Sequence, residues 1–129
     1  MKRISIILFV LLSLSVSAQK RGDITIALLT DLHVTPETTN DTKADEMIDE
    51  INRSDFDLVV VAGDITNTGS SAELRNIRRK LGRIRHRYIA TTGNHETTWS
   101  ESADTEFRRL WGHNGCTTAK AGDYLFVAY

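Results

Sequence analysis

Three apolar runs in this chain each end in a short polar motif, and this arrangement constrains the fold more than any other feature. The motifs are Asp31-Leu32-His33, Gly63-Asp64 and Gly93-Asn94-His95-Glu96. Asp31 and Asp64 lie 33 positions apart, and Asp64 and Asn94 lie 30 apart. Each interval has room for one strand–helix crossover. The pattern therefore predicts parallel strands whose carboxyl ends bring the three motifs to one edge of a sheet.

Strand and helix patterns alternate along the chain. The predicted strands span residues 24–30, 57–62, 88–92, 116–120 and 124–129. Apolar side chains at helical spacing predict helices over residues 42–52, from about 70 to about 82, and over 103–111. The nearly continuous apolar run of the first strand indicates burial on both faces. The sequence therefore predicts an α/β fold with a mostly parallel sheet, flanking helices and a C-terminal hairpin.

The first 18 residues differ from the rest of the chain. A basic start precedes a mostly apolar stretch over residues 4–14, and small residues follow up to Ala18. This pattern predicts a signal peptide, residues 1–18, cleaved after Ala18, and hence a secreted or periplasmic protein. An N-terminal membrane anchor is the alternative, but the apolar run is shorter than the ~20 residues that span a bilayer. We expect a mature domain over residues 19–129 with no stable membrane span.

Charge and cysteine content narrow the partners and the means of stabilisation. The formal net charge of −1 provides no basic field that would indicate nucleic-acid binding. Cys116 is the only cysteine, so no internal disulfide can form, and we expect it to be buried as a small apolar residue. A basic cluster begins on the second predicted helix and comprises Arg75, Arg78, Arg79, Lys80, Arg83, Arg85 and Arg87. We expect a solvated helix face, with a contact surface for an anionic substrate or lipid as the alternative.

The three motifs indicate a metal site only in combination, because none of them is specific enough alone. An aspartate after a strand often caps a helix, and Gly-Asp is a common turn dipeptide. The third motif is more specific, because Gly93 lets the backbone approach a ligand closely and three polar side chains follow it. At matching strand ends, carboxylates, an amide and imidazoles suit a pair of divalent cations.

In order, spacing and strand context the motifs resemble those of the calcineurin-like metallophosphoesterase superfamily. The resemblance covers about residues 24–129. It implies the N-terminal part of a four-layer αββα sandwich. It also implies hydrolysis of phosphate mono- or diesters at a centre of two divalent metal ions. Manganese, iron, zinc or a mixed pair all suit these ligand types, so the identity of the metals stays open.

The resemblance also implies roles for individual residues. Asp31 and His33 would bind the first metal, Asp64 would bridge both metals, and Asn94 would bind the second. His95 would face the substrate as the catalytic residue, stabilising phosphoryl charge or protonating the leaving oxygen. Two further residues would orient their neighbours, Glu96 and Asn67.

The sequence departs from the family pattern after the third motif. The family continues with a lone histidine and then Gly-His-x-His, and neither follows here. His113 stands in Gly112-His113-Asn114-Gly115, which has no second histidine, so we expect a turn there. We therefore expect a metallophosphoesterase domain that is truncated at its C-terminal end.

Other functions remain as alternatives. One is a non-catalytic secreted metal-binding or interaction domain that retains half of the site. A receiver-like or hydrolase domain with Asp31 or Asp64 as nucleophile explains neither His33 nor the third motif. Asn67 stands three positions after Asp64, where purple acid phosphatases have a tyrosine, which disfavours that subgroup. Phosphorylated small molecules and phosphodiesters both fit as substrates, and the sequence leaves the oligomeric state open.

Overall fold

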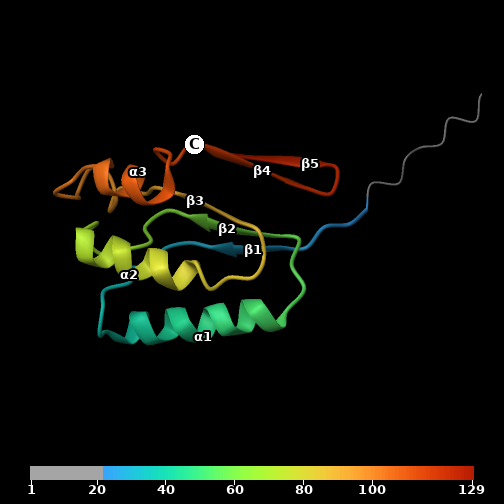
Figure 1. The fold of residues 1–129 in the computed structure, drawn as a ribbon, viewed down its shortest axis with the longest axis horizontal. Helices are drawn as coiled ribbons and strands as arrows, with labels where there is room; N and C mark the ends of the chain where they lie inside the picture. Colours follow the sequence, from blue (N-terminus) through green and yellow to red (C-terminus); the bar gives the residue numbers. More distant parts are fainter. Residues whose placement is uncertain (1–21) are drawn as a thin grey trace, which may run out of the picture.

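The computed structural model describes residues 22–129, and the predicted signal peptide lies outside them. Within this part of the chain, three parallel strands form a sheet in the order β1-β2-β3 (Figure 1). They are β1 (Ile26–Leu29), β2 (Leu58–Ala62) and β3 (Tyr88–Thr91). The helices are α1 (Thr39–Arg53), α2 (Ser71–Leu81) and α3 (Thr105–Trp111). An antiparallel hairpin ends the chain, β4 (Thr117–Ala121) and β5 (Tyr124–Ala128). The predicted fold class is confirmed.

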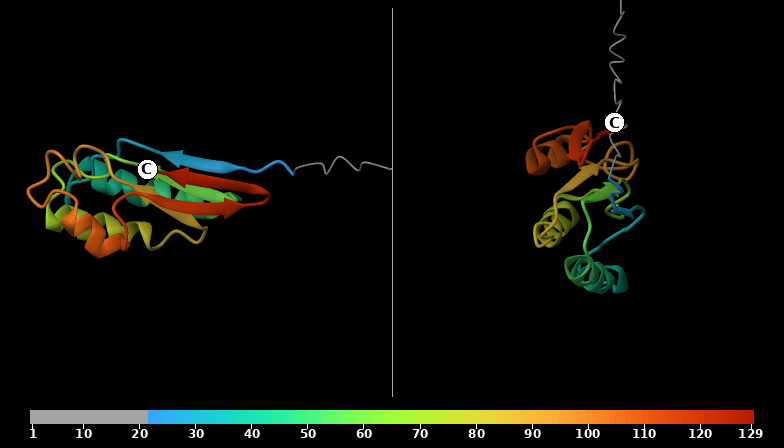
Figure 2. Two further views of the ribbon diagram at one scale, coloured as in Figure 1. Left: turned by 90° about the horizontal axis from the view of Figure 1, so that it is seen from above. Right: turned by 90° about the vertical axis from the view of Figure 1, so that its right-hand side faces the viewer.

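The elements pack in three layers. Side chains alternate between the two faces of a strand, so Val59 and Val61 of β2 face one way and Leu58 faces the other. Val59 and Val61 pack into a core with the helices, including Phe107 of α3. Leu58 packs against the hairpin through Ala119. Figure 2 shows α1 and α2 on one side of the sheet and the hairpin on the other, with α3 beside the hairpin.

The helices begin where polar side chains satisfy their first amides. Thr38 caps α1 by accepting the N–H of Asp41, so the helix begins three residues before the predicted position. The helix α2 begins where the sequence predicts, and Ser70 caps it in a reciprocal arrangement with Glu73. Burial alone would raise the pKa of Glu73, but hydrogen bonds from Thr35 and Thr68 lower it below its ordinary value. Glu73 thereby joins the loop after β1 to the loop after β2.

The basic cluster is only in part the solvated face that the sequence predicts. The prediction is wrong for Lys80, which is 7% exposed. Its Nζ lies 2.6 Å from Oδ2 of Asp45 and 3.0 Å from Oδ1 of Asp41. Arg75 is exposed, but its Nε donates to Glu106 of α3 at 3.0 Å. The cluster therefore connects α2 to both neighbouring helices through ion pairs.

Two expectations about burial are wrong. Leu28 is 66% exposed, because the hairpin covers only part of its face of the sheet, so β1 is not buried on both sides. Cys116 is exposed, immediately before the first residue of β4. No helix among the described residues has both the length and the apolar character needed to cross a bilayer.

Candidate metal centre

The loops after β1 and β2 stay paired beyond the ends of the strands. The N–H of Asp31 donates to the carbonyl of Gly63 at 3.3 Å, and the N–H of His33 donates to the carbonyl of Asp64 at 3.0 Å. The ladder ends at a parallel bridge between Val34 and Thr66. This backbone pairing holds the first two motifs side by side, as their positions after adjacent parallel strands predict.

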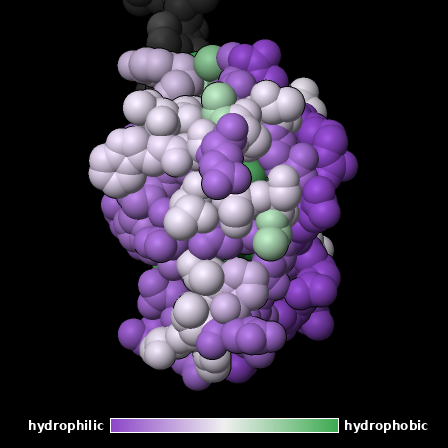
Figure 3. Space-filling model, turned by 90° about the vertical axis from the view of Figure 1, so that its left-hand side faces the viewer, coloured by the Kyte–Doolittle hydropathy of each residue, from purple (hydrophilic) through white to green (hydrophobic). Residues whose placement is uncertain are grey.

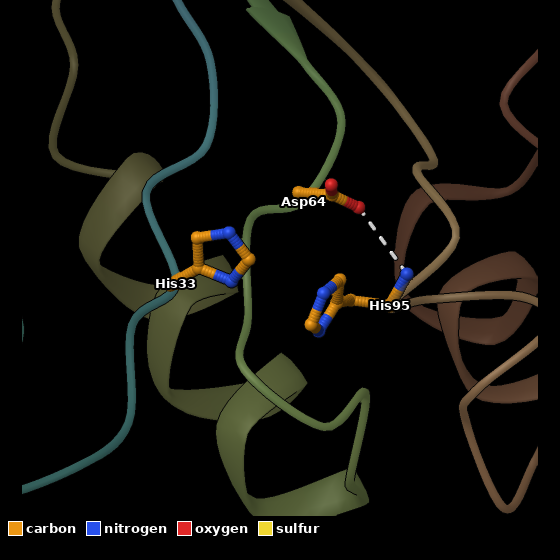
Figure 4. A group of neighbouring side chains, drawn as sticks. All are labelled: His33, Asp64 and His95. Atoms are coloured by element: carbon orange, nitrogen blue, oxygen red, sulfur yellow. Dashed lines mark hydrogen bonds between the residues drawn. The ribbon is translucent and has the colours of Figure 1, made fainter.

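Three side chains converge where the loops after β1, β2 and β3 meet. His33, Asp64 and His95 each offer one ligand atom, and these atoms all lie within 4.8 Å of one another. Figure 4 shows the two imidazoles facing each other with Asp64 beside them, each residue on a different loop. The imidazole centroids are 4.5 Å apart and the rings are 80° from parallel. All three residues are half-buried, so the group can hold an ion and still admit a ligand.

Gly93 makes room for the carboxylate of Asp64. A Cβ at Gly93 would lie 2.1 Å from Oδ1 of Asp64, a distance at which no atom fits. The same Oδ1 accepts the N–H of His95 at 3.2 Å, the bond drawn in Figure 4. Asp64 therefore rests against the third motif and keeps its second oxygen, Oδ2, without a hydrogen bond in the described residues. The close approach predicted for Gly93 is made by this neighbouring side chain.

The backbone is strained at the site residues. The φ angles of Asp31, His33 and Asp64 are +54°, +45° and +46°. This left-handed region costs a non-glycine residue roughly 1–2 kcal/mol. Three such residues lie within two adjacent loops. The rest of the fold therefore holds their side chains in place despite the conformational free energy that this backbone costs. Strain of this kind clusters at functional sites.

The contact between His95 and Asn67 fixes the tautomer of His95. Nδ1 of His95 lies 2.5 Å from the carbonyl oxygen of Asn67. A carbonyl only accepts, so Nδ1 carries the hydrogen and Nε2 is left to bind a metal or a substrate. Asn67 orients its neighbour as predicted, but through its backbone.

Glu96 connects the second motif to the third. It is fully buried, and its Oε1 accepts both the N–H of Thr66, at 2.9 Å, and the Thr66 hydroxyl, at 2.7 Å. Its Oε2 accepts the N–H of Gly93 at 3.0 Å. The carboxylate therefore sets the separation of the loops that carry Asp64 and His95, in agreement with its predicted orienting role.

Two predicted ligands lie outside the three-residue group. Asp31 has a side chain that is 63% exposed, with Oδ1 4.0 Å from Nε2 of His33 and Oδ2 accepting the hydroxyl of Thr30. Asn94 is exposed, and its backbone carbonyl accepts the amides of two later residues in its loop. Asp31 lies at the edge of the group. The metal-binding roles of Asp31 and Asn94 stay predictions.

His113 occupies a turn, as predicted, and is not part of the group. Its Nδ1 accepts the N–H of Gly115 at 3.1 Å, and its ring meets Phe107 edge to face. Burial lowers its pKa below the ordinary value. The ring of Trp99 contacts His95, although the sequence predicts no role for this residue. Its position three residues after Glu96 was the one indication in the sequence that it lies close to the site.

The surface around the group is open and polar. Figure 3 shows the face at the carboxyl ends of the strands, which is mostly hydrophilic or neutral with small hydrophobic spots. A hollow of about 280 Å³ lies beside Asp31, with Lys43 and Asn40 among its lining residues and Val34 and Ala44 contributing apolar surface. A small ligand therefore has space next to Asp31.

The donor set fits a divalent metal ion. Nδ1 of His33 is buried and has no hydrogen-bond partner among the described residues, a cost that coordination of an ion would remove. Imidazole nitrogen and carboxylate oxygen together suit zinc, manganese or iron. Fold and site thus define an α/β domain with a metal-ligand group at the carboxyl ends of its parallel strands.

The family follows from comparison with known proteins. The family model described as calcineurin-like phosphoesterase matches residues 24–128, and the chain belongs to that family. This confirms the resemblance of the three motifs and indicates a metal-dependent hydrolase of phosphate esters. A comparison with curated proteins finds no match.

Proposed function

We propose that this protein hydrolyses phosphate mono- or diesters at a centre of two divalent metal ions. The observation that carries the proposal is the convergence of His33, Asp64 and His95, with ligand atoms within 4.8 Å of one another, on three loops of a calcineurin-like phosphoesterase. Buried carboxylates at Glu73 and Glu96 hold those loops together. Such support is what a site needs to keep its geometry when charged groups enter.

The side chains have separable tasks in this reaction. When bound, the two ions supply positive charge for the phosphoryl oxygens and acidify water. Asp64 offers two anionic oxygens, as a ligand shared by two ions must, and His33 offers a neutral imidazole nitrogen. His95, with Nδ1–H anchored on Asn67, presents Nε2 to the substrate. For this step the imidazole must carry a proton on Nε2 as well as on Nδ1. The ester P–O bond breaks and the leaving oxygen takes the proton from Nε2, while the oxygen of water forms the new bond to phosphorus and the proton that the water loses restores Nε2.

The first experiment measures metal content and turnover together. Elemental analysis and hydrolysis of p-nitrophenyl phosphate and its bis-ester are compared for the full-length protein, Asp64→Asn and His95→Ala. We expect two metal equivalents in the wild type, and loss of both metal and turnover in Asp64→Asn, because an amide offers one neutral oxygen. Asp55→Asn, at an exposed position before β2, is the matched control. Retention of two metals in Asp64→Asn would contradict the bridging role.

His95→Ala decides between two roles for that imidazole. As a residue that faces the substrate, His95 should be dispensable for metal content, and its loss should lower kcat by a factor of about 10²–10⁴. Loss of one metal equivalent in this variant would instead make His95 a ligand, which its place in the three-residue group also allows.

A second candidate function is metal binding without catalysis. Three ligand atoms are enough for one ion, and Asn94 and Asp31 stand outside the group. One bound equivalent and no turnover of either ester would favour this candidate over the phosphoesterase.

We further propose that the mature chain begins at Gln19 and acts outside the cytoplasm. The three-part pattern of residues 1–18 supports this proposal. Mass spectrometry of the mature protein from a secreting host tests it, and an N-terminus that still carries residues 1–18 would refute it.

A further inference from the structure

Trp99 is a large apolar side chain that stays exposed next to the metal-ligand group. Its relative exposure is 66%. Its indole ring meets the imidazole of His95 with centroids 4.6 Å apart and planes 64° from parallel. His95 in turn meets His33, with centroids 4.5 Å apart. The three rings form a row that begins in the metal-ligand group and ends at an indole open to solvent.

The position of Trp99 is fixed by its loop. The N–H of Trp99 donates to the carbonyl of Asn94 at 2.9 Å. The hydroxyl of Ser100 donates to the carbonyl of Gly69 at 2.9 Å. A Cβ at Gly69 would lie 2.3 Å from the carbonyl oxygen of His95, so the loops after β2 and β3 touch with no space between them. The indole is therefore presented by a packed segment.

Because Trp99 is exposed, a ligand that covers its indole ring would bury apolar surface and bind more tightly. The face at the carboxyl ends of the strands is mostly hydrophilic or neutral (Figure 3). Covering an indole removes apolar surface from water, which any apolar group can do. A planar aromatic group gains more, because offset stacking adds to the area term. The side chain therefore favours an aromatic occupant over an aliphatic one.

We propose that Trp99 is a stacking platform for a planar aromatic group carried by the phosphate ester. This inference rests on the proposed phosphoesterase function. The phosphoryl group occupies the space beside His33, Asp64 and His95, and the aromatic group extends over the indole. Trp99 selects the substrate and moves no proton. An aryl ester and a nucleotide share this chemistry, and the experiment separates them.

The test measures binding rather than turnover. Isothermal titration of the manganese-loaded full-length protein compares phenylphosphonate with propylphosphonate, neither of which can be hydrolysed at a P–O–C ester bond. A methylenephosphonate analogue of adenosine monophosphate is the third probe. The variants are Trp99→Leu, which removes the aromatic ring, and Trp99→Phe, which keeps one. Leu125→Ala is the matched control, since Leu125 is 68% exposed on the hairpin, close to its turn.

We expect the wild type to bind phenylphosphonate about tenfold more tightly than propylphosphonate, in line with the worth of an aromatic stack. The preference should vanish in Trp99→Leu and persist in Trp99→Phe and Leu125→Ala. Tighter binding of the adenosine analogue than of phenylphosphonate, lost in Trp99→Leu, supports a nucleobase as occupant; the reverse order supports an aryl ester. An undiminished preference in Trp99→Leu overturns the inference alone. No manganese-dependent binding of any phosphonate overturns it together with the proposed function.

Discussion

Replacing Glu96 with glutamine tests whether this buried carboxylate holds the site loops together. The carboxylate accepts three hydrogen bonds, two from Thr66 and one from the amide of Gly93. Glutamine keeps one acceptor oxygen, and its NH₂ group then faces the N–H of Gly93. One buried donor left unpaired costs about 1–3 kcal/mol. The two remaining bonds lose their charge assistance, about 0.5 kcal/mol each. We therefore expect the free energy of unfolding to fall by about 2–4 kcal/mol.

Urea denaturation followed by circular dichroism measures this loss. With an m-value of about 1–2 kcal/mol/M, the midpoint should fall by about 1–4 M. Glu101→Gln is the matched control, because Glu101 is exposed and makes no hydrogen bond or ion pair in the described residues. A midpoint for Glu96→Gln that equals that of the control would refute the reasoning.

Three further predictions concern Gly93 at the site and the ion pairs of Lys80 and Glu106. Gly93→Ala places a methyl carbon 2.1 Å from Oδ1 of Asp64, so the carboxylate must move, and metal affinity by equilibrium dialysis should fall at least about tenfold; an unchanged affinity would separate Asp64 from the metal. Lys80→Met removes one of the two cations paired with Asp45, which keeps its contact with Arg83, and should lower the free energy of unfolding by about 1–2 kcal/mol in urea, since the carboxylate keeps some access to water; a more stable variant would show that the ion pair is a net cost. A hydrogen bond from Arg109, with help from Arg75, lowers the pKa of Glu106 from 4.5 to about 2. Stability from this carboxylate is therefore complete above pH 4.5 and lost as the pH falls towards 2, and Glu106→Gln should flatten that part of a plot of melting temperature against pH; an unchanged slope would refute the assignment.

The order and type of the elements could be predicted because local signals agree with the fold. The apolar runs before Asp31, Asp64 and Gly93 are strands, and the spacing between them holds one helix each. Exact ends depended on single hydrogen bonds, such as the cap that Thr38 provides for α1. Burial depended on the neighbouring layer. The apolar run of β1 predicts that Leu28 is buried. Leu28 is exposed instead, because the hairpin does not extend over that part of the sheet.

The meeting of His33, Asp64 and His95 could be predicted because adjacent parallel strands end at one edge. The contacts that hold the loops and helices in place at that edge could be predicted only in part. Glu96 was expected to orient its neighbours, but a glutamate in a helix cap such as Glu73 gives no sign that it also binds the loop after β1. Lys80 looks like any surface cation in a basic run, and only the packing of α1 against α2 buries it. Whether Asn94 turns towards an ion depends on a side-chain torsion, which sequence spacing does not specify.

The hydrogen-bond ladder that continues from Asp31 to Val34 after β1 has ended has a kinetic consequence. Because main-chain pairing positions His33 and Asp64, these two side chains are in place before a cation arrives, and the two loops that carry them need not reorganise to capture it. The association rate for different cations should then follow the speed at which each sheds its hydration shell, so that the solution chemistry of the ion sets the time course of loading.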